Sequence, residues 1–347
     1  KNNISKKICL AGKNEIAVGA LLYMIERGWK DQLMVCPNST DSGTSGWQPS
    51  LVRFADALKI PIVGIDQVKA TSNLIFFSLE FDRLIRPKDF QTNQLYNIHF
   101  SALPAYKGMY TSALPLLHGA STSGVTLHKI DAGIDTGPII GQTQFDIAET
   151  WTARDLYFAY MEYGLALFKE HFDQLVSGVS PVSIRQDAIG SSYFSKSAIN
   201  YANLSLDLRD TADGIVRKLR AFTFREYQTM IVAGMEVGGW KIIDTPSREK
   251  PGSILEQTSD TVVISTVDYQ LSLSRACDKD WFALTSEGML DGLNPSFIDT
   301  TDQNGWTPLI RASYQGNHLL CQRLLEAGAD PNRANTNGTT PLMYAAS

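Results

Sequence analysis

The chain has 347 residues, of which 44% are hydrophobic and 19% charged, and a mean hydropathy of -0.12, values typical of a soluble globular protein with two or three domains. Its net charge of -5 argues against a nucleic-acid-binding protein, and its apolar runs fall short of the ~18 residues that a membrane span needs. The four cysteines show no paired spacing, which predicts a reducing cytoplasm and neither a zinc site nor a disulfide framework.

Short apolar runs alternate with helical patterns in the N-terminal part of the chain. The predicted strands are Lys7–Ala11, Gln32–Cys36, Ile60–Ile65 and Leu74–Ser78, and the predicted helices are Ile16–Arg27 and Leu51–Leu58. This alternation predicts an α/β fold, a Rossmann-like and mostly parallel sheet with helices on both faces. The first turn lacks a G-x-G-x-x-G pattern, so dinucleotide binding is not predicted.

The next predicted strand, Leu95–Phe100, carries Asn97 and His99 on one face, because side chains alternate along a strand. The strand cannot continue past Pro104. Open α/β sheets bind ligands at the carboxyl ends of their strands, where this pair lies. An amide and an imidazole together can donate to a developing oxyanion, and a carboxylate such as Asp135 can orient the imidazole or help it take a proton. The set suits acyl transfer without a covalent enzyme intermediate.

Three ordered motifs resemble those of the folate-dependent formyltransferase family: Asn97-Ile98-His99, Leu103-Pro104, and Asp131-Ala132-Gly133-Ile134-Asp135-Thr136-Gly137. The resemblance implies that a formyl group moves from 10-formyltetrahydrofolate to an amine. It implies that Asn97, His99 and Asp135 are catalytic and that no metal takes part. It also implies that the pterin ring is held by Leu79, Glu80, Phe81, Asp131 and Gly133.

Histidines elsewhere in this region have simpler interpretations. His118 precedes a glycine at a predicted helix end, where it suits a capping role. His128 alternates within a predicted strand and is expected to pack or to lie on the surface. No pair of histidines has metal-ligand spacing, so no metal site is predicted.

The second half of the chain changes in character after a long predicted helix, Thr152–Gly178. A helix at Thr211–Ala221 precedes short alternating strands at Tyr227–Val232, Glu236–Ile243, Thr261–Thr266 and Gln270–Ser274. We predict a catalytic domain at 1–190, a connector and small β-rich domain at 191–293, and a C-terminal tail at 294–347. Aromatic residues of the second domain either stack a nucleotide base or pack the core; the candidates for substrate binding are Tyr193, Phe222 and Tyr227.

The tail contains a repeat. The pattern Gly-x-Thr-Pro-Leu begins at Gly305 and again at Gly338, and 338 minus 305 is 33, the period of ankyrin repeats. Trp306 occupies a turn position that makes no demand for an aromatic ring. Either it docks the short repeat on the β-rich domain, or it belongs to a second small-molecule site with Asn304, Arg311 and Tyr314.

The acceptor is the least determined part of the prediction. Residues 205–292 hold 10 Lys and Arg against 14 Asp and Glu, which does not favour tRNA. This balance, with the ankyrin tail, resembles the nucleotide-sugar N-formyltransferases. That resemblance implies a dTDP-linked amino sugar, best matched by 3-amino-3,6-dideoxyglucose, a role in surface polysaccharide synthesis, and a cytoplasmic homodimer without nucleic-acid or membrane partners. The alternatives are a methionyl-tRNA formyltransferase and a non-catalytic ankyrin adaptor or ligand sensor.

Overall fold

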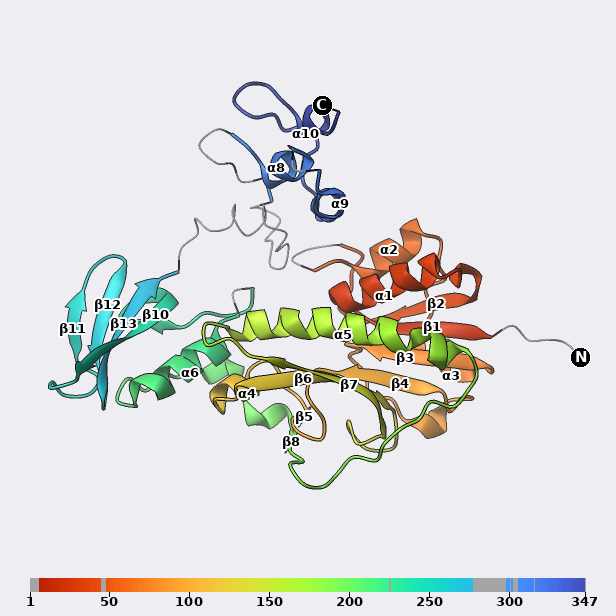
Figure 1. The fold of residues 1–347 in the computed structure, drawn as a ribbon, viewed down its shortest axis with the longest axis horizontal. Helices are drawn as coiled ribbons and strands as arrows, with labels where there is room; N and C mark the ends of the chain where they lie inside the picture. The colour runs from red at the N-terminus through yellow and green to blue at the C-terminus, as the bar shows by residue number, and fades with distance from the viewer. Residues whose placement is uncertain are drawn as a thin grey trace, which may run out of the picture. The chain divides into compact units, whose positions relative to one another are not determined.

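A six-stranded mixed sheet carries the motif strand (Figure 1). The computed structural model describes residues 6–44, 48–224, 226–276, 298–299, 301, 305–314 and 316–346. The sheet has the order β2-β1-β3-β4-β6-β7. Its strands are β1 (Lys7–Gly12), β2 (Leu33–Pro37), β3 (Leu74–Leu79), β4 (Leu95–His99), β6 (Thr122–Lys129) and β7 (Ile139–Asp146). The β1–β2 pair is parallel, whereas β4–β6 and β6–β7 are antiparallel. The α/β prediction is confirmed, with an antiparallel half that supplies part of the site.

Contacts between residues divide the chain into two units. One contains β1, β2, α1 (Asn14–Glu26), α2 (Leu51–Ala57) and the C-terminal helices. In this unit α1 packs on β1 and α2 on β2, through apolar residues that recur at helical spacing. Ser50 caps α2 by accepting a hydrogen bond from the backbone N–H of Arg53. Gly28 follows α1 with a φ of 85°, a left-handed conformation that favours glycine.

The predicted strand Ile60–Ile65 is wrong. The chain makes only a single bridge there, between Val35 and Ile62, and then enters the short helix α3 (Ile65–Ala70). Two features limit the pairing. Lys59 has a φ of 59°, outside the strand region, and Pro61 has no N–H to donate.

The other unit contains β4, β6, β7 and the long helix α5 (Ala153–Val176), which packs on these strands. Thr152 begins α5 with a capping box: its hydroxyl accepts from the N–H of Asp155, whose carboxylate accepts from the N–H of Thr152. Tyr160 and Phe168 are fully buried on the inner side of the helix. Short elements complete this unit: α4 (Leu114–Leu117), β5 (Lys107–Gly108), β8 (Tyr193–Phe194), and 3-10 turns at Pro87–Asp89, Lys196–Ala198 and Tyr201–Asn203. A further 3-10 turn, Lys30–Gln32, precedes β2.

A five-stranded antiparallel sheet forms the predicted β-rich region, in the order β11-β12-β13-β10-β9. Its strands are β9 (Ile231–Val232), β10 (Met235–Pro246), β11 (Ile254–Gln257), β12 (Thr261–Ser265) and β13 (Tyr269–Arg275). Helix α6 (Ala212–Phe222) packs on β10 and β13, as its position before the strands suggests. The strand β11 was not predicted, because this edge strand is largely exposed and carries no alternating pattern.

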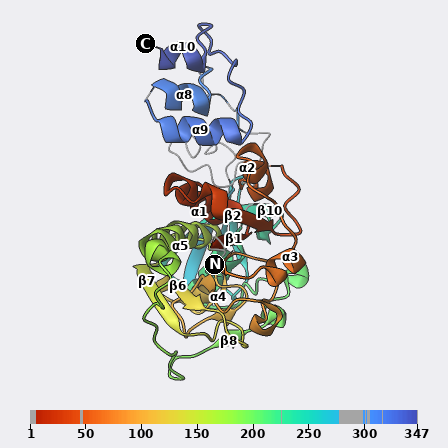
Figure 2. The same cartoon turned by 90° about the vertical axis from the view of Figure 1, so that its right-hand side faces the viewer.

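The C-terminal helices confirm the ankyrin prediction. Helices α8 (Pro308–Tyr314), α9 (His318–Glu326) and α10 (Pro341–Ala345) stack beside one another (Figure 2). Leu309, Leu320 and Leu324 form their small core. The boundaries of the three proposed domains stay predictions, and residues 277–297 lie outside the described residues.

The capping box gives a direct test of what fixes α5 on the sheet. Thr152→Ala should lower the free energy of unfolding by about 1 kcal/mol, because the N–H of Asp155 loses its acceptor and the Asp155 carboxylate loses the Thr152 hydroxyl. Urea unfolding measures the change. Thr245→Ala, at an exposed position of β10, is the control and should change stability by less than about 0.5 kcal/mol. Equal stability of Thr152→Ala and the wild type would contradict this account of the helix start.

Candidate active site

The register of two antiparallel strands builds the first part of the site. Asn97 and His99 lie on β4, and Asn97 pairs directly with His128 on β6. Cross-strand partners point to the same face of a sheet, so the two side chains meet. The Asn97 amide nitrogen Nδ2 lies 3.1 Å from His128 Nε2. His128 is 2% exposed, and its predicted packing role is incomplete, since it contacts both Asn97 and the acidic residue described next.

The carboxylate of Asp135 lies between the two imidazole rings. Its Oδ2 is 3.4 Å from His99 Nδ1, and its Oδ1 is 3.6 Å from His128 Nε2. The backbone N–H of Gly108 donates to Oδ2 at 2.9 Å. The structure therefore brings the three predicted residues together and adds His128 as a fourth.

Backbone carbonyls fix which nitrogen of each histidine carries a proton. A carbonyl only accepts, so His99 Nε2 must donate to the Tyr106 carbonyl at 2.8 Å. His128 Nδ1 likewise donates to the Lys129 carbonyl at 2.8 Å. His128 Nε2 then lies between Asn97 Nδ2 and Asp135 Oδ1, while the proton-accepting atom of His99, Nδ1, faces Asp135.

Opposing electrostatic effects set the charges. Burial acts to raise the pKa of Asp135, but His99, His128 and the N–H of Gly108 outweigh it and lower this pKa to about 2. Burial lowers the pKa of His99, while Asp135 and the Tyr106 carbonyl act to raise it. At neutral pH the site therefore holds an ionised carboxylate beside an imidazole that gains a proton only with the help of that carboxylate.

A compact turn, residues 131–137, delivers Asp135. The carboxylate of Asp131 closes it by accepting from the Gly133 N–H at 3.0 Å and the Thr136 hydroxyl at 2.6 Å. A Cβ on Gly137 would lie 1.7 Å from the Lys129 carbonyl oxygen, so only glycine fits there. Of the residues predicted to hold the pterin ring, Asp131 and Gly133 thus shape the turn.

The loop that carries the other predicted pterin residues is fixed by two asparagines. The Glu80 carbonyl accepts from Asn38 Nδ2 at 2.9 Å, and the Glu80 carboxylate accepts from Asn14 Nδ2 at 3.2 Å. Glu80 has a φ of 60°, a left-handed conformation that these bonds hold in place. The Leu79 side chain is buried and Phe81 is half-buried. Sequence reasoning missed both asparagines, because no local pattern links them to the loop.

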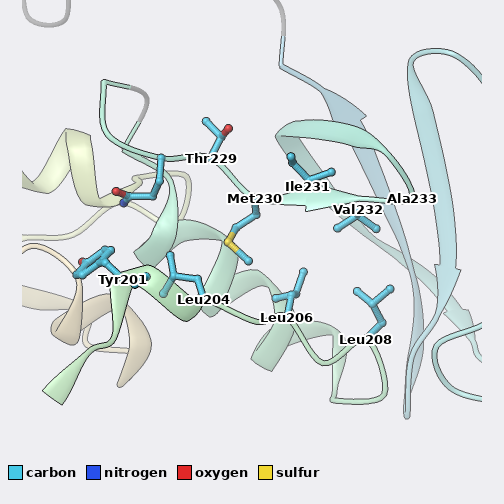
Figure 3. Close-up of a pocket in the computed structure, with 11 residues that line it drawn as sticks. Tyr201, Leu204, Leu206, Leu208, Thr229, Met230, Ile231, Val232 and Ala233 are labelled. Atoms are coloured by element: carbon cyan, nitrogen blue, oxygen red, sulfur yellow. The ribbon is translucent and has the colours of Figure 1, made fainter. Parts of the chain in front are cut away.

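The residues predicted for substrate binding have different environments. Tyr193 is 54% exposed and Tyr227 is 64% exposed, whereas Phe222 is 8% exposed and packs on Tyr201 with ring centroids 6.3 Å apart. Tyr201 also lines a groove of about 480 Å³ in the same unit, whose other lining side chains are mostly apolar and include none of the catalytic trio (Figure 3). Substrate binding by these three residues stays a prediction.

Trp306 contacts rings of the tail itself. Its ring centroid lies 5.3 Å from that of Tyr314 and 5.0 Å from that of Tyr344. Arg311 is half-buried on α8, and Asn304 lies outside the described residues. The prediction of a second ligand site at these residues is not tested by their geometry.

Comparisons with known proteins identify two parts of the chain. Residues 79–170 match the family model described as formyl transferase, and residues 282–347 match ankyrin repeats. The solved structure of WlaRD, a sugar 3N-formyl transferase in the presence of dTDP and 5-N-formyl-THF, is 40% identical, with a TM-score of 0.72 over 78% of this chain and 97% of WlaRD. The N-formyltransferase from Helicobacter canadensis, in complex with folinic acid and dTDP-3-aminofucose, is 38% identical, with a TM-score of 0.72 over 78% of this chain and all of that chain (100%).

These matches show that the chain belongs to the formyltransferase family. Its relatives at 38–40% identity are a sugar 3N-formyl transferase and an N-formyltransferase. The methionyl-tRNA formyltransferase of Paraburkholderia phymatum is more distant, at 26% identity over 78% of this chain and 89% of that protein. Among the described residues, no helix is long and apolar enough to cross a membrane.

The sequence analysis did not assign His128 to the site, and a substitution at this residue tests the site. His128→Leu should raise the pKa of Asp135 and reduce turnover at least about tenfold, because the carboxylate loses a neighbour that favours its ionised form and each ~1.4 kcal/mol of lost stabilisation is tenfold in rate. Steady-state formyl transfer measures the loss, and circular dichroism checks the fold.

His318→Leu serves as the control, because His318 is exposed at the start of α9. His128→Gln is a second variant that retains hydrogen-bonding capacity and should be less impaired. A folded His128→Leu enzyme with wild-type turnover would show that His128 only packs the sheet.

Proposed function

We propose that this chain transfers a formyl group from 10-formyltetrahydrofolate to the amine of a dTDP-linked amino sugar. The observation that carries the proposal is the ionised Asp135 carboxylate between His99 and His128, with Asn97 alongside. The two relatives at 38–40% identity support the donor class and the acceptor class, since folates and dTDP or a dTDP-amino sugar accompany them. The particular acceptor in this proposal is dTDP-3-amino-3,6-dideoxyglucose.

The chain offers groups that fit a folate. The turn 131–137 is closed by the hydrogen bonds of Asp131, and Ile134 within it is 40% exposed, which gives an apolar contact for a flat ring. The loop of Leu79, Glu80 and Phe81 is also fixed, by Asn14 and Asn38, so its backbone groups are preorganised. On the family resemblance, we propose that residues of each segment contact the pterin ring, which brings the formyl group as the electrophile.

Each catalytic residue then has a distinct task. Asn97 Nδ2 lies 3.1 Å from His128 Nε2 and carries two hydrogens, one of which we assign to the formyl oxygen as it gains charge. His99 has a different role from the oxyanion donor expected from the motif, because its Nε2 proton is engaged by Tyr106.

Proton transfer falls to the pair of His99 and Asp135. As the neutral amine attacks the formyl carbon, the new carbon–nitrogen bond makes the amine acidic. Its proton passes to this pair, where Asp135 stabilises the imidazolium formed at His99 Nδ1. The same proton then goes to the departing folate nitrogen as its bond to the formyl carbon breaks, so the site returns to its starting state.

The alternatives have less support. A methionyl-tRNA acceptor is disfavoured by the excess of 14 acidic over 10 basic residues at 205–292 and by the 26% identity of that relative. A non-catalytic ankyrin adaptor would not need the hydrogen-bonded set around Asp135. A homodimer, a cytoplasmic location and a role in surface polysaccharide synthesis belong to the proposal on the family resemblance alone.

Two substitutions test the assigned roles. His99→Asn and Asp135→Ala should each lower kcat by roughly 10²–10³, the loss typical when a group that stabilises transition-state charge is removed. Asp244→Ala, which alters an exposed carboxylate on β10 of the same unit, is the control and should keep wild-type turnover. A well-folded His99→Asn enzyme that turns over normally would contradict the mechanism.

A panel of acceptors tests the substrate class. With 10-formyltetrahydrofolate as donor, we expect mass spectrometry to detect one added formyl group on a dTDP-amino sugar and none on charged initiator tRNA. The reason is the acidic balance of the second domain, which offers no excess of cations for phosphates. Efficient tRNA formylation that falls steeply with salt would reverse the assignment.

A further inference from the structure

The segment that follows α5 runs past the residues around Asp135 before the chain enters the five-stranded antiparallel sheet. We call residues 184–194 the strap (Figure 1). It begins at Ile184, which exchanges two backbone hydrogen bonds of 2.8 Å with Ile139 on β7. It ends at β8, which pairs in parallel with β5. The strap therefore has fixed contacts at both ends.

Gln186 of the strap holds the turn that carries Asp135. Its Nε2 donates to the carbonyl oxygens of Asp135 and Gly137, both at 2.8 Å. The two hydrogens of this amide are thus both used on carbonyls, which fixes its orientation. Asp135 has a φ of 53°, a conformation that is unfavourable outside glycine and persists only where its surroundings impose it.

Ser192 of the strap holds the second loop, residues 104–109. Its hydroxyl accepts from the Tyr106 N–H at 2.8 Å, and its carbonyl accepts from the Lys107 N–H at 2.9 Å. Tyr106 has a φ of 56°, so this loop also depends on outside support. A Cβ on Gly108 would lie 2.3 Å from the Phe194 carbonyl oxygen, which reflects how closely loop and strap approach.

Both of these segments contact the catalytic pair. The loop supplies the Tyr106 carbonyl to His99 and the Gly108 N–H to Asp135. The turn supplies Asp135 itself. Neither contact to the strap involves a side chain that takes part in the chemistry, so the strap acts on the reaction only through geometry.

We propose that the strap is a positioning element of the reaction, with Gln186 and Ser192 as positioning residues that set the distance and orientation between His99 and Asp135. The inference rests on the proposed function, in which this pair moves the proton. Displacement of a catalytic group by about 1 Å can cost about 10²-fold in rate, so loss of either anchor has a measurable effect on kcat.

Gln186→Leu and Ser192→Ala should each lower kcat roughly 10- to 100-fold, while KM for the donor and the acceptor changes by less than about threefold. Ser192→Thr retains a hydroxyl acceptor and should restore most of the rate. Ser191→Ala is the matched control, because among the described residues the Ser191 hydroxyl accepts from the Lys107 side-chain Nζ and from no backbone N–H of the loop, and it should keep wild-type kcat.

Histidine NMR gives a readout that a purely structural role would not change. In folded Gln186→Leu and Ser192→Ala proteins the titration of His99 should shift, because its distance to Asp135 has changed, whereas that of the exposed His318 should not. This measurement does not depend on the acceptor, so it separates failure of the strap from failure of the proposed substrate. Folded variants with kcat within about twofold of wild type and an unshifted His99 would overturn the proposal.

Discussion

A buried carboxylate held between two imidazoles is the constraint on which the site depends. Burial alone would raise the pKa of Asp135 and favour its uncharged form. His99, His128 and the Gly108 N–H reverse that effect and keep the group ionised. Each of these three partners comes from a different segment, β4, β6 and the loop at 104–109, so the charge state of one residue requires the whole arrangement to form.

The antiparallel half of the sheet serves this constraint. If β6 ran parallel to β4, the carboxyl ends of the two strands would lie side by side. The chain would then leave β6 at the same edge as β4 and would not run back past Asn97. Because β6 runs back along β4, His128 lies opposite Asn97, and the chain then enters the turn that delivers Asp135. Strand β4, its partner β6 and the turn 131–137 follow one another along the chain. This order explains why the residues of the site lie within a short stretch of sequence.

The sequence predicted what local patterns determine. Alternation along β4 placed Asn97 and His99 on one face, and the 33-residue spacing identified the ankyrin helices. It missed what depends on register or on backbone partners. His128 joins the site only through the pairing of β4 with β6. The Asn38 contact to Glu80 joins loops that are far apart in the sequence. Gln186 binds backbone carbonyls, which every residue has, so no side-chain pattern indicates its partners. The strand predicted at Ile60–Ile65 is wrong, and it shows that an apolar run does not by itself pair with a neighbouring strand.

The most direct test of this account is the charge of Asp135 itself. Carbon-13 NMR of the aspartate carboxyl groups, with the resonance assigned by its loss in Asp135→Asn, follows that charge as the pH is lowered. We expect the Asp135 resonance to remain that of a carboxylate below pH 3.8, the ordinary pKa of an aspartate, and to titrate with a pKa of about 2. Titration at or above 3.8 would contradict the claim that two histidines and a backbone N–H hold this carboxylate ionised.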